Sequence, residues 1–158
     1  MAKLEEGKPA PDFSLPSSEG REISLADFKN KKKVVLYFYP KDDTPGCTKE
    51  ACDLRDAIKK VEREDAVVLG LSKDGLASHG AFIKKYKIPF TLLSDESKGT
   101  IKKYGVWKEK SLYGKKFMGV ERTTVVIDKK GIVRRIFSKV KVDGHAQEIL
   151  ETLAGIGS

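Results

Sequence analysis

The chain has 158 residues, of which 39% are hydrophobic and 34% are charged, and its formal net charge is +8. This length suits one domain with a sizeable core, and the composition is typical of a soluble globular protein. The sequence has no run of about 20 apolar residues of the kind that spans a membrane, and its first residues lack the apolar core of a secretory signal. We therefore expect a cytoplasmic protein with a single domain over residues 1–158.

The N-terminal stretch, residues 7–30, has the features of a peripheral structure. Its prolines and glycines favour a short edge hairpin around residues 17–20, and a helical turn follows near Leu25. We expect this stretch to cover the sheet. The basic run at residues 29–33 and the positive net charge raise nucleic-acid binding as an alternative. Because lysines and glutamates are mixed along the rest of the chain, without an aromatic-studded basic surface, we predict no nucleic-acid partner.

Residues 34–39 are six consecutive apolar or aromatic residues. They are too few for an isolated helix and rich in β-branched and aromatic types, so they predict a central strand that is buried on both faces. Pro40 and Pro45 end this strand and force a turn. From Cys47 to Val61 apolar residues recur at spacings of three and four, which predicts an amphipathic helix over residues 47–61.

Both cysteines of the chain lie at the start of this predicted helix. Cys47 falls on the inward face of the first turn, where free N–H groups and the helix dipole favour an anion by roughly 0.3–2 kcal/mol. That is too little for full ionisation of a thiol near neutral pH, so a second cation is expected. The hydroxyl of Thr44 and the backbone N–H groups of Gly46 and Cys47 are available to bind a substrate. Cys52 is turned toward the polar side.

The rest of the chain alternates between strands and helices. In chain order we expect a strand at residues 66–71, a helix at 78–86, a strand at 91–93, a helix at 96–104, a loop with aromatic anchors at 107–118, a β-hairpin formed by residues 123–128 and 132–137, and a helix at 146–153. Such an order predicts an α/β sandwich around a mixed sheet.

Pro40, Thr44 and Cys47 reproduce the Pro-x-x-x-Thr-x-x-Cys signature of peroxiredoxins. With Cys52 five residues later, the pattern resembles the Q-type branch of that family, also called bacterioferritin comigratory protein. The likeness continues through residues 70–74, 78–79, 89–95, 105–107, 113–122 and 126–128. It implies a thioredoxin-like fold, in which helices flank a central mixed β-sheet and the N-terminus forms a β-hairpin.

The resemblance also implies a role for each of five residues. Cys47 would be the peroxidatic cysteine, Thr44 a hydrogen-bond partner of the peroxide, Pro40 a shield over the pocket, Arg122 the cation beside thiolate and substrate, and Cys52 the resolving cysteine. The implied activity is reduction of hydrogen peroxide and organic hydroperoxides. It proceeds through a sulfenic acid and an intramolecular disulfide, which thioredoxin or a similar dithiol reduces. The implied protein is a monomer that needs no metal, haem or flavin.

Plainer interpretations stand beside these roles. Cys52 could be only a half-buried small residue, Thr44 a simple helix cap, and Arg122, judged from the sequence without the resemblance, an ordinary surface arginine. His79 and His145 could form a zinc site with the two cysteines, but the spacings fit no closed site well. The functional alternative is a redox sensor or binding module that forms the same disulfide and passes it to a partner without turnover.

The spacing of Cys47 and Cys52 has a mechanical consequence. In a regular helix, two residues five apart have Cα atoms roughly 8.6 Å from each other, whereas a disulfide requires less than about 7 Å. The first turns of the helix at residues 47–61 must therefore unwind in each catalytic cycle, and Gly46 makes this easier.

Overall fold

The computed structural model describes residues 4–157, so the predictions that concern residues 1–3 and 158 lie outside the described part. Its central sheet has five strands. In spatial order they are β5 (Thr91–Ser94), β4 (Ala66–Ser72), β3 (Lys33–Phe38), β8 (Thr123–Ile127) and β9 (Val133–Phe137). Because β3 runs parallel to β4 and antiparallel to β8, the sheet is mixed, as predicted.

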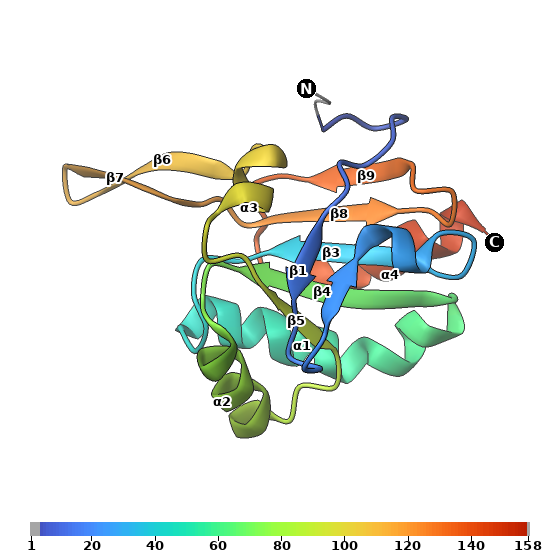
Figure 1. Cartoon of the computed structure of the whole chain (residues 1–158), viewed down its shortest axis with the longest axis horizontal. Helices are drawn as coiled ribbons and strands as arrows, with labels where there is room; N and C mark the ends of the chain where they lie inside the picture. Colours follow the sequence, from blue (N-terminus) through green and yellow to red (C-terminus); the bar gives the residue numbers. More distant parts are fainter. Residues whose placement is uncertain (1–3, 158) are drawn as a thin grey trace.

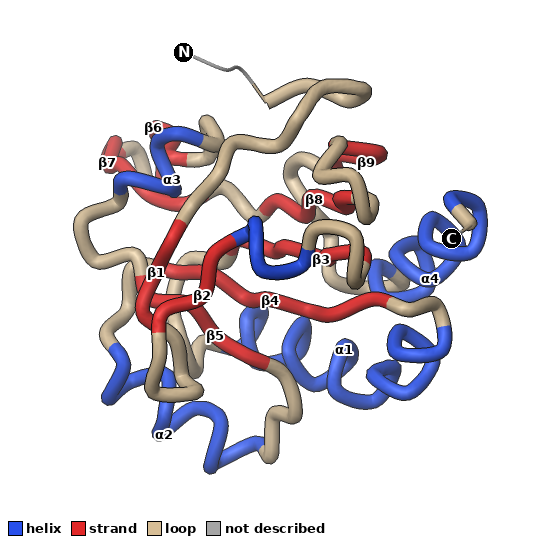
Figure 2. The backbone as a smooth tube through the Cα atoms, turned by 45° about the vertical axis from the view of Figure 1, so that its right-hand side comes forward, coloured by secondary structure: helices blue, strands red, loops and turns tan. Residues whose placement is uncertain are grey.

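The two faces of the sheet are covered by different parts of the chain (Figures 1 and 2). One face packs against α1 (Pro45–Arg63), α2 (Leu76–Tyr86) and α4 (His145–Ile156). The other packs against the N-terminal hairpin of β1 (Ser14–Pro16) and β2 (Glu22–Ser24), the 3-10 turn η1 (Leu25–Phe28), and the segment around α3 (Gly99–Lys103). The predicted hairpin, helical turn and covering role of residues 7–30 are thus confirmed.

Strand β3 shows how the sequence produces these two layers. Val35 and Tyr37 point into the core beneath α1, whereas Leu36 and Phe38 point into the opposite core. This alternation is the period-2 geometry of a strand, and all four side chains are at most 1% exposed. The prediction of a central strand buried on both faces is therefore confirmed. Across residues 4–157, no helix has both the length and the apolar character that a bilayer crossing requires.

All four predicted helices differ at one end or both in the structure, and for two of them the backbone shows why. Helix α1 begins at Pro45, two residues before Cys47, because proline fits the first helical position, where its missing N–H is not needed. The helix predicted at residues 96–104 is only the short α3. Lys98 precedes α3 with a left-handed φ of 65°, so the backbone just before it cannot belong to a regular helix.

The prediction of a loop at residues 107–118 was wrong. This stretch forms an antiparallel hairpin of β6 (Trp107–Leu112) and β7 (Lys115–Val120), which projects from the body of the molecule (Figure 1). Its two turn residues, Tyr113 and Gly114, both have positive φ, as a tight two-residue hairpin turn requires. Because both faces of its outer part are exposed, the sequence lacks the apolar alternation that identifies a strand.

Gly70 in β4 has no space for a side chain. A Cβ at this position would lie 2.7 Å from Leu92 Cδ2 and 2.9 Å from Tyr37 Cζ. We expect Gly70→Ala to lower the free energy of unfolding, measured with urea, by about 1–3 kcal/mol because the core becomes overpacked. Gly80→Ala in α2 is the control, since a Cβ there meets nothing within 4 Å; it should be neutral or stabilising by up to about 1 kcal/mol. Equal destabilisation by both substitutions would contradict this account.

Candidate active site

Cys47 lies in the first turn of α1, just beyond the end of β3. Its side chain is 2% exposed and belongs to the same core as Ala51 and Leu54, which confirms that it faces inward. Cys52 is only partly buried, and both cysteines are free thiols. The two sulfur groups therefore occupy different environments on one continuous helix.

The start of α1 presents backbone N–H groups next to Cys47. The first hydrogen bond within the helix runs from Thr48 N to Thr44 O at 2.8 Å, so the amides of Gly46 and Cys47 precede it and have no acceptor inside the helix. Thr44 occupies the N-cap position, but its hydroxyl donates to the carbonyl of Lys41 at 3.0 Å instead of capping the helix. The interpretation of Thr44 as the N-cap residue is therefore confirmed for its position, but its side chain makes no capping hydrogen bond, and the hydroxyl remains near the helix start.

Arg122 supplies the second cation that the sequence required. It follows β7, and its Nη2 donates to Cys47 Sγ at 3.4 Å, while its Nη1 donates to Glu50 Oε1 at 2.6 Å. A Cβ at Gly46 would lie 3.2 Å from Nη2, so the glycine leaves room for this close approach. The arginine side chain is only 17% exposed, which keeps both contacts largely out of water. The structure thus brings together Cys47, Arg122 and the start of α1.

Glu50 is a residue of this site that the sequence reasoning missed. Its carboxylate is 2% exposed, and among the described residues its Oε2 has no hydrogen-bond partner. Burial raises the pKa of Glu50 to about 7, although the charge of Arg122 acts in the opposite direction. The available indication was its spacing, since Glu50 lies three residues after Cys47 and therefore on the same helix face.

The hydroxyl of Tyr37 is a second buried polar group near the thiol. It too has no hydrogen-bond partner among the described residues. Burial raises the pKa of Tyr37 well above its ordinary value, and the nearby charges of Glu50 and Cys47 raise it further. The hydroxyl therefore stays protonated at neutral pH.

A second network fixes the loop that leads from β3 into α1. Asp42 is buried in this loop and accepts hydrogen bonds from Tyr39 Oη at 2.6 Å, Ser78 Oγ at 2.8 Å and His79 Nδ1 at 2.7 Å. The other ring nitrogen of His79 faces the carbonyl of Leu93 at 2.9 Å. Two acceptors fit an imidazolium that donates from both nitrogens. The network ties the loop to α2 and to β5.

The pKa values of Asp42 and His79 agree with the hydrogen bond between them. Burial opposes the ionisation of Asp42, but the hydrogen bonds from His79 and Tyr39 outweigh it and lower the pKa of the carboxyl. Burial likewise opposes the imidazolium, but the hydrogen bond and charge of Asp42 outweigh it and raise the pKa of His79. The result is a buried ion pair beneath the loop that carries Pro40 and Thr44.

The histidines do not form a zinc site with the cysteines. Within residues 4–157, the only three potential metal ligands whose donor atoms all lie within 4.8 Å are Asp42, Asp74 and His79. Their donor atoms already take part in hydrogen bonds, for example from Asp42 N to Asp74 Oδ2 at 2.8 Å. His145 lies elsewhere, with Nε2 2.7 Å from Thr124 Oγ1.

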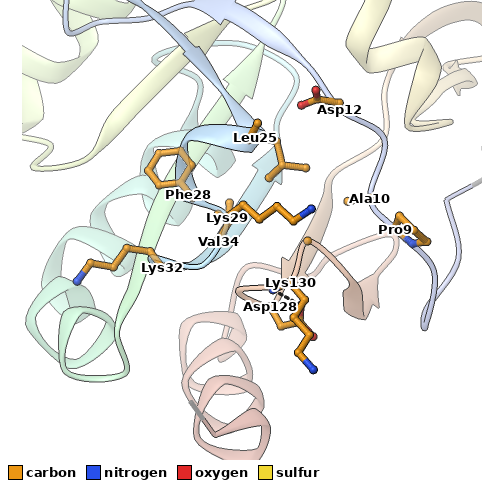
Figure 3. Close-up of a pocket in the computed structure, with 12 residues that line it drawn as sticks. Pro9, Ala10, Asp12, Leu25, Phe28, Lys29, Lys32, Val34, Asp128 and Lys130 are labelled. Carbon is orange, nitrogen blue, oxygen red and sulfur yellow. Dashed lines mark hydrogen bonds between the residues drawn. The ribbon is translucent and has the colours of Figure 1, made fainter.

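A separate cavity of about 200 Å³ lies at the other end of β3 (Figure 3). Leu25, Phe28 and Val34 line its apolar part, and the side chain of Lys29 extends along it. Val34 is near the start of β3, whereas Cys47 follows the end of that strand, so the cavity is remote from the thiol. It contributes nothing to the candidate active site.

A buried cysteine at a helix N-terminus, held by an arginine beside a mixed sheet flanked by helices, defines a thiol redox site in a thioredoxin-like fold. The chain belongs to the AhpC/TSA family, whose sequence pattern matches residues 7–136. A Coxiella burnetii relative named putative peroxiredoxin bcp is 51% identical over 150 residues, which cover 95% of this chain and 99% of the relative.

Solved structures agree with this assignment. The crystal structure of a PrxQ mutant from Xylella fastidiosa matches with a TM-score of 0.91 at 33% identity and 99% coverage of each chain. A bacterioferritin comigratory protein from Xanthomonas campestris, whose structures address alkyl peroxide reduction, matches with a TM-score of 0.87 at 36% identity and 92% coverage of each chain. The thioredoxin-like fold and the resemblance to Q-type peroxiredoxins are thereby confirmed.

The raised pKa of Glu50 predicts how the stability of the protein depends on pH. Its pKa is about 7 in the folded protein and 4.5 in its ordinary state, so the folded protein binds more protons than the unfolded chain between these values. The free energy of unfolding should therefore fall as pH rises from 4.5 to 7, with a contribution from Glu50 of up to about 3 kcal/mol. Glu50→Gln should remove this part of the slope, measured by urea unfolding across the pH range.

Glu62→Gln is the matched control, because Glu62 lies exposed on the same helix. Its slope should equal that of the unsubstituted protein. If Glu50→Gln also left the slope unchanged, the raised pKa of Glu50 would be ruled out.

Proposed function

We propose that Cys47 is the peroxidatic cysteine of a thiol-dependent peroxidase that reduces hydrogen peroxide and organic hydroperoxides. The observation that carries this proposal is the contact of Arg122 Nη2 with the buried sulfur at the start of α1. A guanidinium and a helix N-terminus together favour the thiolate, which is the nucleophilic form. The family and the alkyl peroxide reduction named for the Xanthomonas campestris relative support the same reaction class.

In the first step the thiolate attacks the terminal oxygen of the hydroperoxide. A sulfur–oxygen bond forms, the oxygen–oxygen bond breaks, and the sulfur is oxidised to a sulfenic acid while the leaving oxygen takes a proton to become water or an alcohol. Arg122 and the amides of Gly46 and Cys47 stabilise the charge that moves between the oxygens. Because the Thr44 hydroxyl donates to Lys41 O, its lone pairs are free to accept the hydrogen of the peroxide.

The next steps return the enzyme to its reduced form. The thiol of Cys52 attacks the sulfenic sulfur of Cys47, water leaves, and an intramolecular disulfide forms. An external dithiol, which we assign to thioredoxin or a similar protein, then reduces this disulfide and is itself oxidised to a disulfide. Pro40, which is partly buried at the end of β3, shields the pocket from solvent. This cycle requires no metal, haem or flavin.

The proposal includes a monomer that acts in the cytoplasm, with no nucleic-acid or membrane partner. One chain supplies both Cys47 and Arg122, so the site needs no residue from a second copy. Two free cysteines suit a reducing compartment, where such pairs are catalytic or redox-sensing rather than structural.

The roles of the two cysteines are tested by peroxide consumption. With excess dithiothreitol or thioredoxin, the unsubstituted protein should show many turnovers, and Cys47→Ser should abolish them because the nucleophile is lost. Cys52→Ser should lose most activity with thioredoxin but keep activity with dithiothreitol, which can reduce the sulfenic acid directly. Absence of turnover in the unsubstituted protein would overturn the peroxidase and favour a one-shot sensor.

The cycle also requires a change in α1. Cys47 and Cys52 lie in one uninterrupted helix in this structure, and a regular helix holds such positions about 8.6 Å apart at Cα. The amides of residues 46–54 should therefore exchange faster with solvent, and lose helical content, in the disulfide form than in the reduced form. The carboxyl-terminal half of α1 serves as the internal control. Identical exchange at residues 46–54 in both forms would exclude unwinding.

A further inference from the structure

The hairpin of β6 and β7 is a prominent feature that the catalytic cycle leaves without a role. It extends from the body on the side where β3 ends and α1 begins (Figure 1). It also carries four of the five large hydrophobic side chains that are exposed in the described part of the chain. These are Leu112, Tyr113, Phe117 and Met118, whose exposed fractions are 57%, 95%, 47% and 49%. Clustered exposed apolar groups of this kind mark interaction sites.

The register of the hairpin separates its side chains onto two faces, because residues directly opposite each other in an antiparallel pair share a face. Lys110 pairs with Phe117, and Leu112 pairs with Lys115. With Lys108 two positions before Lys110, these five residues form one face, which we call the Lys110 face. It therefore combines three lysines and two apolar side chains without a carboxylate.

The other face of the hairpin has a different character. Glu109 pairs with Met118, and Ser111 pairs with Lys116. The ammonium of Lys116 lies 3.7 Å from the carboxylate of Glu109, so charges on this face are balanced. The net positive charge of the hairpin is consequently concentrated on the Lys110 face.

The base of the Lys110 face lies close to Arg122 and Cys47. Lys110 is partly buried, and its stem packs close to Gly119, where a Cβ would lie 3.3 Å from Lys110 Cδ. Burial lowers the pKa of Lys110 and the charge of Arg122 lowers it further, whereas Cys47 and Glu121 act in the opposite direction. The carboxylate of Glu121 is therefore also near the base of this face. Lys110 is thus within electrostatic reach of the thiol and its arginine, while Leu112 and Lys115 lie farther out toward the hairpin turn.

We propose that the Lys110 face is the docking surface for the protein reductant, an acidic dithiol protein with apolar surface around its reactive cysteines. This inference rests on the proposed function, since it concerns the step in which the dithiol reduces the Cys47–Cys52 disulfide. The lysines attract the acidic partner, and Leu112 and Phe117 supply apolar contact area at the encounter. Because the base of the Lys110 face lies beside Arg122, a partner bound to this face would hold its thiols near the Cys47–Cys52 disulfide.

The test compares two double variants with the same change in charge and similar changes in apolar area. Lys115→Glu with Phe117→Ser alters the Lys110 face, and Lys116→Glu with Met118→Ser alters the opposite face. For each protein, kcat/KM is measured with an acidic thioredoxin and with dithiothreitol, a small dithiol that needs no docking surface. The ratio of the two values isolates docking from the chemistry with peroxide.

We expect the Lys110-face variant to lower this ratio by about tenfold or more, through a higher KM for thioredoxin. The opposite-face variant should stay within about twofold of the unsubstituted protein, and added salt should raise the KM of the unsubstituted protein for thioredoxin. Equal ratios in the two double variants would overturn the inference. So would turnover with dithiothreitol but not with thioredoxin in the unsubstituted protein.

Two further outcomes distinguish a failure of the proposed function from a failure of the docking proposal. If the unsubstituted protein fails to turn over with either reductant, the proposed function itself fails. If size-exclusion chromatography shows that only the Lys110-face variant changes oligomeric state, while the ratio is unchanged, the surface joins two copies of the chain and the reductant proposal is wrong.

Discussion

The site depends on two contacts that the guanidinium of Arg122 makes with α1. It is a nearly buried cation that contacts a sulfur and a carboxylate, Cys47 Sγ at 3.4 Å and Glu50 Oε1 at 2.6 Å. A buried charge is tolerated only when it is paired, and here both partners come from the first two turns of α1. The pairing of β8 with β3 in the sheet places Arg122, one residue before β8, beside that helix. The order of strands in the sheet therefore determines where the cation lies relative to the thiol.

The loop between β3 and α1 is held from two sides. On one side Arg122 contacts the helix that the loop leads into. On the other, Asp42 receives three side-chain hydrogen bonds and pairs with the imidazolium of His79. These anchors act on different segments, because Asp42 lies before the helix and Cys47 lies within it. Unwinding of the first turns can therefore release Cys47 while the Asp42 network still fixes the base of the loop.

Much of this arrangement could be predicted from the sequence, and the failures have physical causes. Cys47 and the buried strand before it were identified because apolar periodicity reports directly on burial. The hairpin at residues 107–118 was missed because its exposed faces give no such periodicity. Glu50 was missed because a glutamate between other charges on a helix normally faces solvent, and only its tertiary contact with Arg122 gives it a buried partner. Contacts between residues 72 apart in the chain leave little trace in local patterns.

The contacts of Arg122 with both Cys47 and Glu50 also bear on the proposed cycle. In the reduced protein Arg122 donates to both the sulfur of Cys47 and the carboxyl of Glu50, whose burial raises its pKa to about 7. In the proposed cycle, oxidation of a Cys47 thiolate to the sulfenic acid and then to the disulfide would remove its negative charge. The carboxyl of Glu50 would then remain as the buried partner of Arg122. In the proposed cycle the arginine would thus keep a buried partner when Cys47 moves toward Cys52, which would lower the electrostatic cost of unwinding the helix.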